Sequence, residues 1–361
     1  MFGNTFRGKS VWVSGHTGFK GSWLALWLLR LGAKVHGFSL PPPTDPSLFE
    51  QLGLEGAIAH MTGDVRDERT VADSIRRADP DFIFHLAAQP LVRRSYEIPV
   101  ETFSTNIMGT VHVLEAMRAL SKPHVSVIVT SDKCYRNDEA GRPFEEGDPL
   151  GGDDPYSASK AACEIVAAAY LRSFFPGARA ATARAGYVIG GGDWAADRLI
   201  PDCIRALSGG RPIRLRNPGA IRPWQHVLEP LCGYLRLAQV LRASSEETLP
   251  GAFNFGPAWD SCQSVLDVVK RVVEFWPGTY EGQPQKNAPA EANLLHLSIS
   301  KSRNLLGWRP VWNCDDSIRK TVDWYRAPHE SPESTRAFSE AQIRDFEIAA
   351  AALGMDWTSP A

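Results

Sequence analysis

The sequence predicts an α/β fold, with a doubly wound, Rossmann-type parallel sheet and a smaller, irregular second lobe. From residue 10 to about residue 185, short apolar runs alternate with amphipathic stretches of helical length, a pattern typical of βαβ units. A glycine-rich turn follows the first apolar run. After Gly186 the chain changes to short elements interrupted by proline and glycine, which indicates a separate lobe.

The apolar runs predict strands at Ser10–Ser14, Lys34–Ser39, Ala57–His60, Phe82–Leu86, Val125–Thr130 and Arg179–Arg184. The stretches between them predict helices at Gly21–Leu31, Asp67–Ala78, Val100–Leu120 and Tyr156–Phe174. We therefore expect a sheet domain over residues 1–187, the second lobe mainly over 188–328, and a C-terminal tail over 329–361. Two later segments, Ala252–Phe255 and Cys262–Trp276, are compatible with either part.

The composition, with 43% hydrophobic and 22% charged residues among 361, is that of ordinary globular proteins. No stretch reaches the ~18 apolar residues that a membrane-spanning helix needs, and the first residues lack the apolar core of a secretory signal. A soluble, cytoplasmic protein is expected. The six cysteines form no C-x-x-C pair, which argues against disulfides and a metal site. A net charge of −2 gives no general attraction for nucleic acid.

The glycine turn opens the first predicted helix. Glycines at this spacing allow a tight turn and close approach of a pyrophosphate, while the helix N-terminus supplies amide donors. Its place directly after the first strand predicts a dinucleotide cofactor. The residues predicted to hold it are Gly15, His16, Thr17, Gly18, Phe19 and Gly21.

The second strand ends at Ser39 with no carboxylate for an adenosine ribose and no arginine for a 2′-phosphate. NAD is therefore preferred over NADP. Asp64 and Val65 follow the third strand, where the adenine amine could be bound, although a helix N-cap is an equally good interpretation. Leu86–Ala88 end the fourth strand with apolar, mostly small residues, which suits a backbone lying against a nicotinamide ribose; simple packing is the alternative.

Tyr156 and Lys160 lie one helical turn apart in a predicted helix, so they share one face. A tyrosine can take a proton from a sugar hydroxyl during hydride transfer when a nearby lysine cation lowers its pKa. Ser131, Asp132 and Lys133 stand at the end of the fifth strand, where ligands gather in open α/β sheets. A plain turn would favour Gly, Asn or Pro there, so these five residues are predicted to be catalytic.

Further motifs join these along residues 8–325. The full set is Gly15-x-x-Gly18-x-x-Gly21, His85-Leu86-Ala87-Ala88-Gln89, Ser131-Asp132-Lys133, Tyr156-x-x-x-Lys160, Arg184-Ala185-Gly186, Gly190-Gly191-Gly192-Asp193-Trp194 and Arg222-Pro223-Trp224-Gln225-His226-Val227. Together they resemble the extended short-chain dehydrogenases/reductases, and specifically the CDP-glucose 4,6-dehydratases. Within these motifs, Gln89 and His226 are predicted to contact the substrate, although a lone histidine is more often structural.

The resemblance implies a redox-neutral conversion of CDP-glucose to CDP-4-keto-6-deoxyglucose with bound NAD, in deoxysugar biosynthesis. It implies that Tyr156 deprotonates the C4 hydroxyl as hydride passes to NAD, while Ser131 hydrogen-bonds that oxygen. The new ketone acidifies C5–H, water leaves from C6, and hydride returns there. Asp132 would be the acid for the departing hydroxyl and Lys133 the base at C5.

The role of Lys133 has two interpretations. A free lysine, with a pKa of about 10.4, is almost wholly protonated at neutral pH and cannot accept a proton. Burial, Lys160 and the positive nicotinamide ring would lower the pKa of Lys133, whereas Asp132 would raise it. The alternative is that Lys133 stabilises the enolate electrostatically.

The second lobe has an arginine-rich stretch with a single acid, Asp202. Its arginines are Arg198, Arg205, Arg211, Arg214, Arg216 and Arg222. Forked guanidinium groups suit a diphosphate, so we place the nucleotide of the substrate here. The predicted contacts come from Arg198, Arg214, Arg216 and Arg222. One departure concerns Tyr187, because the family that the chain resembles usually has asparagine there and its carboxamide contact is missing.

Other functions stay open. A nucleotide-sugar 4-epimerase or a GDP-mannose-type dehydratase would share the glycine turn and the Tyr–Lys pair, but epimerases usually lack an acid–base pair after the serine, and the mannose dehydratases carry glutamate there. A non-catalytic NAD-sensing protein of the same fold would typically have lost the tyrosine or the lysine. We also expect a homodimer or higher homo-oligomer, through the predicted helices Val100–Leu120 and Tyr156–Phe174.

Overall fold

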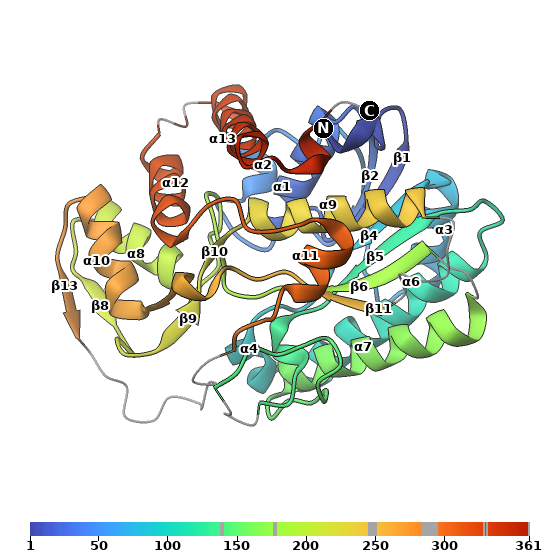
Figure 1. Ribbon diagram of the computed structural model, residues 1–361, viewed down its shortest axis with the longest axis horizontal. Helices are drawn as coiled ribbons and strands as arrows, with labels where there is room; N and C mark the ends of the chain where they lie inside the picture. Colours follow the sequence, from blue (N-terminus) through green and yellow to red (C-terminus); the bar gives the residue numbers. More distant parts are fainter. Residues whose placement is uncertain are drawn as a thin grey trace.

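A seven-stranded parallel sheet lies at the centre of the computed structural model (Figure 1). The structure describes residues 1–137, 141–175, 179–244, 251–282, 295–327, 329 and 331–359. Parts of the predicted lobe and tail, at 245–250, 283–294, 328, 330 and 360–361, lie outside the described residues. The strand order is β11-β6-β5-β4-β1-β2-β3. It reverses between β1 and β4, where ligands bind in folds of this kind.

The strands of the sheet match the predicted ones closely. They are β1 (Ser10–Ser14), β2 (Lys34–Ser39), β3 (Ala59–Thr62), β4 (Phe82–His85), β5 (Val125–Val129), β6 (Arg179–Arg184) and β11 (Gly251–Asn254). Successive residues point to opposite faces, so each strand contributes to two cores. Val13 packs in the core that holds Leu24 and Leu231, whereas Trp12 packs in the core that holds Val71 and Val113.

Helices cover both faces of the sheet (Figure 1). Those that line its two cores include α1 (Phe19–Arg30), α3 (Glu68–Ala78), α6 (Gly109–Arg118), α7 (Pro155–Phe174), α9 (Leu228–Ala243) and α13 (Pro332–Ala352). Shorter helical segments lie between the main elements: η1 (Phe2–Asn4), α2 (Leu48–Gln51), α4 (Val92–Glu97), α11 (Ser300–Leu306) and η5 (Asp356–Thr358). In the described part of the chain, none of the helices is long and apolar enough to span a membrane.

The predicted helix Val100–Leu120 is interrupted by a π turn. It consists of α5 (Pro99–Phe103), the π turn η2 (Ser104–Met108) and α6. A π turn carries one extra residue relative to the α-helix and often lies at a functional site. Here it places the buried Asn106 against the end of β4, where the side chain bonds to Gln89.

The second lobe is built from pairs of short strands around a separate apolar cluster (Figure 1). The pairs are β7 (Val188–Ile189) with β10 (Gln225–His226), β8 (Ile213–Leu215) with β13 (Tyr280–Gly282), and β9 (Ile221–Pro223) with β12 (Cys262–Ser264). The segment η4 (Trp259–Ser261) and the helices α8 (Leu199–Ser208), α10 (Val265–Phe275) and α12 (Cys314–Arg326) complete the lobe.

The chain crosses between the two parts more than once. Gly251–Asn254 returns to the sheet, where it pairs with β6. Helix α9, which lies in the sequence between two segments of the lobe, packs on the sheet. The predicted C-terminal tail consists largely of the helix α13. Its apolar face packs on α1, where Trp27 Nε1 donates a hydrogen bond to Glu347 at 3.0 Å. The sequence interpretation missed this helix because its apolar residues are spaced between many alanines.

Candidate active site

The glycine turn between β1 and α1 has room only for glycine at two positions. Gly15 has a φ of +75°, and a Cβ there would come within 2.8 Å of the backbone nitrogen of Ala87. A Cβ on Gly21 would come within 2.1 Å of the carbonyl oxygen of Gly15. No side chain caps α1 at Gly18, so its first amides remain for an anion. The turn therefore fits the pyrophosphate of a dinucleotide.

The side chains of His16 and Thr17 turn into the protein. The ring of His16 is buried, bonds to His60 at 2.7 Å, and has a pKa lowered by burial to about 3. The hydroxyl of Thr17 donates to the carbonyl oxygen of Leu40 at 2.9 Å. These contacts fasten the turn to β3 and to the loop after β2, so the predicted cofactor contacts of both residues would have to come from their backbone.

Asp64 is not a helix N-cap. The cap of α3 is Asp67, whose side chain accepts two backbone amides. Asp64 instead pairs with Arg66 at 2.5 Å, and this hydrogen bond lowers the pKa of the Asp64 carboxyl. Val65 is buried, and its carbonyl oxygen accepts from His112 at 2.8 Å. Adenine binding by Asp64 and Val65 stays a prediction.

The end of β4 is tied to the end of β1 through Ser14. Its hydroxyl oxygen accepts the amides of Leu86 at 3.1 Å and Ala87 at 3.2 Å, and bonds to His85 at 2.7 Å. These bonds hold Leu86–Ala88 directly beside the glycine turn. Their predicted contact with the nicotinamide end of the cofactor is compatible with this position and stays a prediction.

Gln89 fixes a loop, and its predicted role in substrate binding is not supported. Its side-chain nitrogen donates to Thr102 at 3.0 Å and to the carbonyl oxygen of Leu91 at 3.1 Å, while its side-chain oxygen accepts the Leu91 amide at 2.7 Å. Asn106 accepts the backbone amide of Gln89 at 2.8 Å and donates to Ser159 at 2.8 Å. Asn106 could not be identified from the sequence, because only the π turn places it there.

Ser131 and Asp132 form a buried pair at the end of β5. Ser131 caps the short helix η3 (Asp132–Cys134) and donates to Oδ1 of Asp132 at 2.9 Å. Oδ2 of Asp132 is buried, and no described residue hydrogen-bonds to it. That oxygen lies against Gly186, where a Cβ would come within 1.9 Å of it. One carboxylate oxygen is thus held by the protein and the other remains for a ligand.

Tyr156 lies at the start of α7, against the same pair. Burial raises the pKa of Tyr156 to about 12, and Asp132 adds to the rise. A hydrogen bond with Ser131 and the positive charges of Lys133 and Arg198 act in the opposite direction. The predicted lowering of this pKa by Lys160 is wrong for the protein groups alone, because burial outweighs the nearby cations. Nζ of Lys160 points to the carbonyl oxygen of Val129 at 3.4 Å.

A buried ion pair fastens α7 to the sheet beneath Tyr156. Arg184 of β6 donates to Glu164 of α7 at 2.8 Å, and both side chains are almost fully buried. Thr182 donates to the same carboxylate at 2.7 Å, and Thr130 donates to its other oxygen. Since Thr130 immediately precedes Ser131, this network fixes α7 relative to the turn Ser131–Lys133.

Lys20 is a site residue that the sequence interpretation missed. It lies in the first turn of α1, and burial lowers the pKa of Lys20 to about 8. Arg198 and Lys160 lower it further, whereas Asp132 raises it. The Lys20 ammonium is thus electrostatically coupled to Asp132, Lys160 and Arg198. The sequence feature that could have identified Lys20 is a charged side chain at one of the non-glycine positions of the glycine motif.

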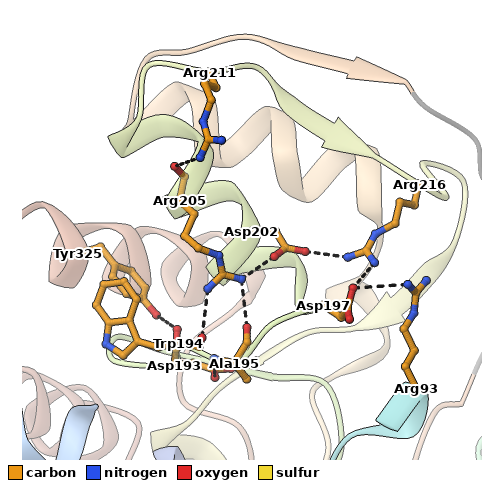
Figure 2. Close-up of polar contacts among 10 residues, drawn as sticks. All are labelled: Arg93, Asp193, Trp194, Ala195, Asp197, Asp202, Arg205, Arg211, Arg216 and Tyr325. Carbon is orange, nitrogen blue, oxygen red and sulfur yellow. Dashed lines mark hydrogen bonds and ion pairs between the residues drawn. The ribbon is translucent and has the colours of Figure 1, made fainter. Parts of the chain in front are cut away.

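The arginines of the lobe form a network of ion pairs rather than an open basic cluster (Figure 2). Asp202 accepts from Arg205 at 2.6 Å and from Arg216 at 2.7 Å. Asp197 accepts from Arg216 and, at 3.5 Å, from Arg93 of α4, so it joins the lobe to the sheet domain. The sequence interpretation overestimated the positive charge, because Asp197 stands just before the arginine-rich stretch.

The predicted substrate arginines therefore separate into different groups. Arg198 donates to Asp193 at 2.8 Å and acts electrostatically on Tyr156, and Arg222 is buried in β9. Arg216 is held by the two carboxylates described above. Arg214 of β8 is exposed and pairs with Glu281 of β13 at 3.2 Å. A substrate contact from Arg214 is not supported.

His226 is structural, so its predicted substrate contact is wrong. The ring is completely buried between Trp23 and Trp312, with centroid distances of 6.3 and 4.9 Å. Its Nδ1 accepts the amide of Leu228 at 3.3 Å. Burial lowers the pKa of His226 to about 3, so the ring is neutral and serves as part of the core beneath α9.

The model of the family described as GDP-mannose 4,6 dehydratase matches residues 12–321. A CDP-glucose 4,6-dehydratase of Salmonella typhimurium is 46% identical over 335 residues, covering 90% of this chain and 92% of that protein. Among solved structures, the UDP-glucose 4-epimerase of Thermus thermophilus in complex with NAD is 28% identical, with a TM-score of 0.73 over 88% of this chain and 99% of that one. MoeE5 in complex with UDP-glucuronic acid and NAD shares the fold at 23% identity and a TM-score of 0.74, covering 88% of this chain and 99% of that one.

Proposed function

The chain belongs to the GDP-mannose 4,6-dehydratase family, and from this we propose that it converts CDP-glucose to CDP-4-keto-6-deoxyglucose. It is an NAD-dependent nucleotide-sugar 4,6-dehydratase. The choice of CDP-glucose is supported by the 46% identity with the Salmonella enzyme of that name. The observation that carries the dehydration is Oδ2 of Asp132, a buried carboxylate oxygen without a partner among the described residues, next to the Ser131–Tyr156 pair.

NAD supplies the capacity to accept a hydride from C4 of the sugar and to return it to C6. The glycine turn would hold its pyrophosphate, and Leu86–Ala88 would lie against its nicotinamide end. Because the hydride is returned, the reaction consumes no cofactor. The protein groups have to bind and orient the sugar, and to move protons.

In the first half of the reaction, the Tyr156 oxygen takes the proton from the C4 hydroxyl, and Ser131 orients that hydroxyl. The hydrogen bond between Tyr156 and Ser131 supports this division, since both groups then converge on one substrate oxygen. Lys133 and Arg198 favour the ionised tyrosine. Their positive charges favour the transfer of the proton to Tyr156 but offset only part of the effect of burial, and the positive nicotinamide ring of bound NAD would lower the pKa of Tyr156 further.

In the second half, the elements of water leave from C5 and C6. The C5–H bond breaks, its proton passes to the neutral amine of Lys133, and its electron pair forms the enolate of the C4 ketone. The C6 hydroxyl departs as water with a proton from Oδ2 of Asp132. Bound NAD would supply the hydride that C6 regains, Lys133 returns the proton to C5, and the proton taken up by Tyr156 restores the acid form of Asp132 through solvent. Asp132 fits the role of acid because Ser131 already holds its other oxygen.

Lys133→Arg separates the two roles proposed for Lys133. Arginine keeps the positive charge but cannot act as a base. If Lys133 is the C5 base, the variant should still oxidise C4 but should lose C5 exchange with solvent deuterium by about 10²-fold or more. Deuterium uptake by mass spectrometry and nicotinamide absorbance measure the two steps. Recovery of most of the wild-type turnover would instead assign Lys133 to enolate stabilisation.

Arg222→Ala should weaken binding of CDP-glucose by about tenfold or more while leaving the affinity for NAD unchanged, because the proposed contact is to the substrate diphosphate. Isothermal titration with each ligand measures both effects. Arg214→Ala is the matched control, since Arg214 lies on the same lobe but is exposed and paired with Glu281. Equal weakening of both ligands by Arg222→Ala would indicate a structural role.

The proposed function is tested by incubating the protein with CDP-, dTDP-, UDP- and GDP-hexoses in the presence of NAD. A 4-keto-6-deoxy product from CDP-glucose, formed faster than from the other sugars, is the expected result. No net NADH should accumulate, because the hydride is returned. Formation of a 4-epimer without loss of water would overturn the proposal.

A homodimer is also proposed, through the segment Val100–Met108 and α7. Exposed apolar side chains on these elements support it: Val100 (81%), Ile165 (60%), Phe174 (48%), Met108 (45%) and Phe103 (38%). Such residues gathered on two neighbouring helices are typical of protein interfaces. Sedimentation equilibrium of the full chain measures its mass.

For the cellular location we propose the cytoplasm, whose reducing conditions suit six cysteines without a disulfide.

A further inference from the structure

The ring of Tyr187 lies between two cations that come from different parts of the chain. The ammonium nitrogen of Lys133, in η3, is 5.8 Å from the ring centroid. The guanidinium carbon of Arg222, in β9, is 5.3 Å from the same centroid. Trp224 packs edge-on against the ring, with 6.1 Å between centroids. One side chain thus contacts a group proposed for the chemistry at C5 and a group proposed for binding the diphosphate.

The backbone of Tyr187 is in the left-handed region, with a φ of +50°. Bulky residues rarely adopt this conformation, which asparagine and glycine tolerate far better. The neighbouring strand β10 holds it in place. Gln225 donates its backbone amide to the Tyr187 carbonyl at 3.2 Å and its side-chain amide to the Gly186 carbonyl at 2.9 Å. Conformations of this kind cluster at functional sites, where the surrounding structure imposes them.

The side chain of Lys133 is less enclosed than those of its two neighbours. The side chains of Ser131 and Asp132 are buried and hydrogen-bonded to each other. Lys133 is only partly buried, and its long stem has many rotamers. An aromatic ring attracts a cation to its face, so Tyr187 reduces the space that the ammonium group explores. A reacting group needs this, because small displacements from the productive geometry cost large factors in rate.

We propose that Tyr187 is a positioning residue for the step at C5. Its ring holds the Lys133 ammonium group beside the sugar, and Arg222 on the same ring links that position to the bound diphosphate. The proposal rests on the proposed function, since a 4-epimerase has no proton-removal step at C5. It also explains why an aromatic side chain stands at a backbone position that suits asparagine.

The test compares Tyr187→Asn with Tyr187→Phe. Asparagine keeps the left-handed backbone and removes the ring, whereas phenylalanine keeps the ring and removes only the hydroxyl. In Tyr187→Asn, solvent exchange at C5 of CDP-glucose should slow by about ten- to hundredfold, while oxidation at C4, on which Lys133 acts only through its charge, should slow far less. Tyr187→Phe should retain both rates. The ratio of the two rates does not depend on the fraction of folded protein, so the comparison holds even if one variant is less stable.

An unchanged ratio of the two rates in Tyr187→Asn would overturn the proposal, and a parallel fall of both rates would show a merely structural role. A double variant provides the second check. In the Lys133→Met background, Tyr187→Asn should cause no further loss of C5 exchange, because residues that act through one another are not additive. Additive losses would contradict the proposal. If the wild-type protein fails to oxidise CDP-glucose at all, the proposed function fails instead.

Discussion

Tyr156→Phe should lower the turnover of CDP-glucose by about 10²–10⁴-fold, the usual effect of removing a positioned acid–base group. The substitution deletes only the hydroxyl that is hydrogen-bonded with Ser131. The remaining ring stays buried at the start of α7, so folding and NAD binding should be unchanged. Steady-state kinetics, melting temperature and NAD titration measure the three quantities.

Tyr170→Phe is the matched control for Tyr156→Phe. Tyr170 lies on the same helix, and its hydroxyl donates to Glu115 at 2.7 Å, well away from the catalytic turn. Its loss should leave turnover at the wild-type level. A Tyr156→Phe variant that is as active as this control would remove Tyr156 from the mechanism.

Gly186→Ala should abolish most of the dehydration, by about 10²-fold or more, without blocking oxidation at C4. The new methyl group would lie 1.9 Å from Oδ2 and 2.1 Å from Cγ of Asp132, so the carboxylate must move away from its position beside Ser131. Because Gly186 has no left-handed backbone angle, the effect comes from this contact alone. Product formation and nicotinamide absorbance under single-turnover conditions distinguish the two steps.

Two comparisons make the Gly186 prediction specific. Asp132→Asn should give the same kinetic pattern, and combining it with Gly186→Ala should add little, because both changes act on one carboxylate. Gly219→Ala is the neutral control, since nothing lies within 4 Å of its added Cβ. If Gly186→Ala dehydrates CDP-glucose as fast as this control, Asp132 is not the acid.

The sheet and the catalytic turn could be predicted because their signals are local. Apolar runs of strand length and the glycines of the first turn are set by backbone requirements that the sequence displays directly. Ser131 and Tyr156 were found for the same reason, since strand ends and helix faces are visible in the sequence. Their contact across the site follows from the fold class alone.

The remaining site residues depend on contacts between distant parts of the chain. His226 lies in a motif that resembles those of the family, yet its ring is enclosed by Trp23 and Trp312, which come from opposite ends of the sequence. Arg214 and Arg216 looked available until their carboxylate partners were located. No local pattern reveals such partners, because pairing is decided by tertiary structure.

The π turn at Ser104–Met108 limits the changes in length that this segment of the chain tolerates. Each residue of an α-helix rotates the chain by about 100°, so deleting one residue here would turn Asn106 away from Gln89 and Ser159. The loop that carries Leu86–Ala88 would lose its anchor, although no residue that touches the sugar had been altered. Related chains can therefore vary in the amino acids of this segment far more readily than in its length, and single-codon deletions here should be absent among active relatives.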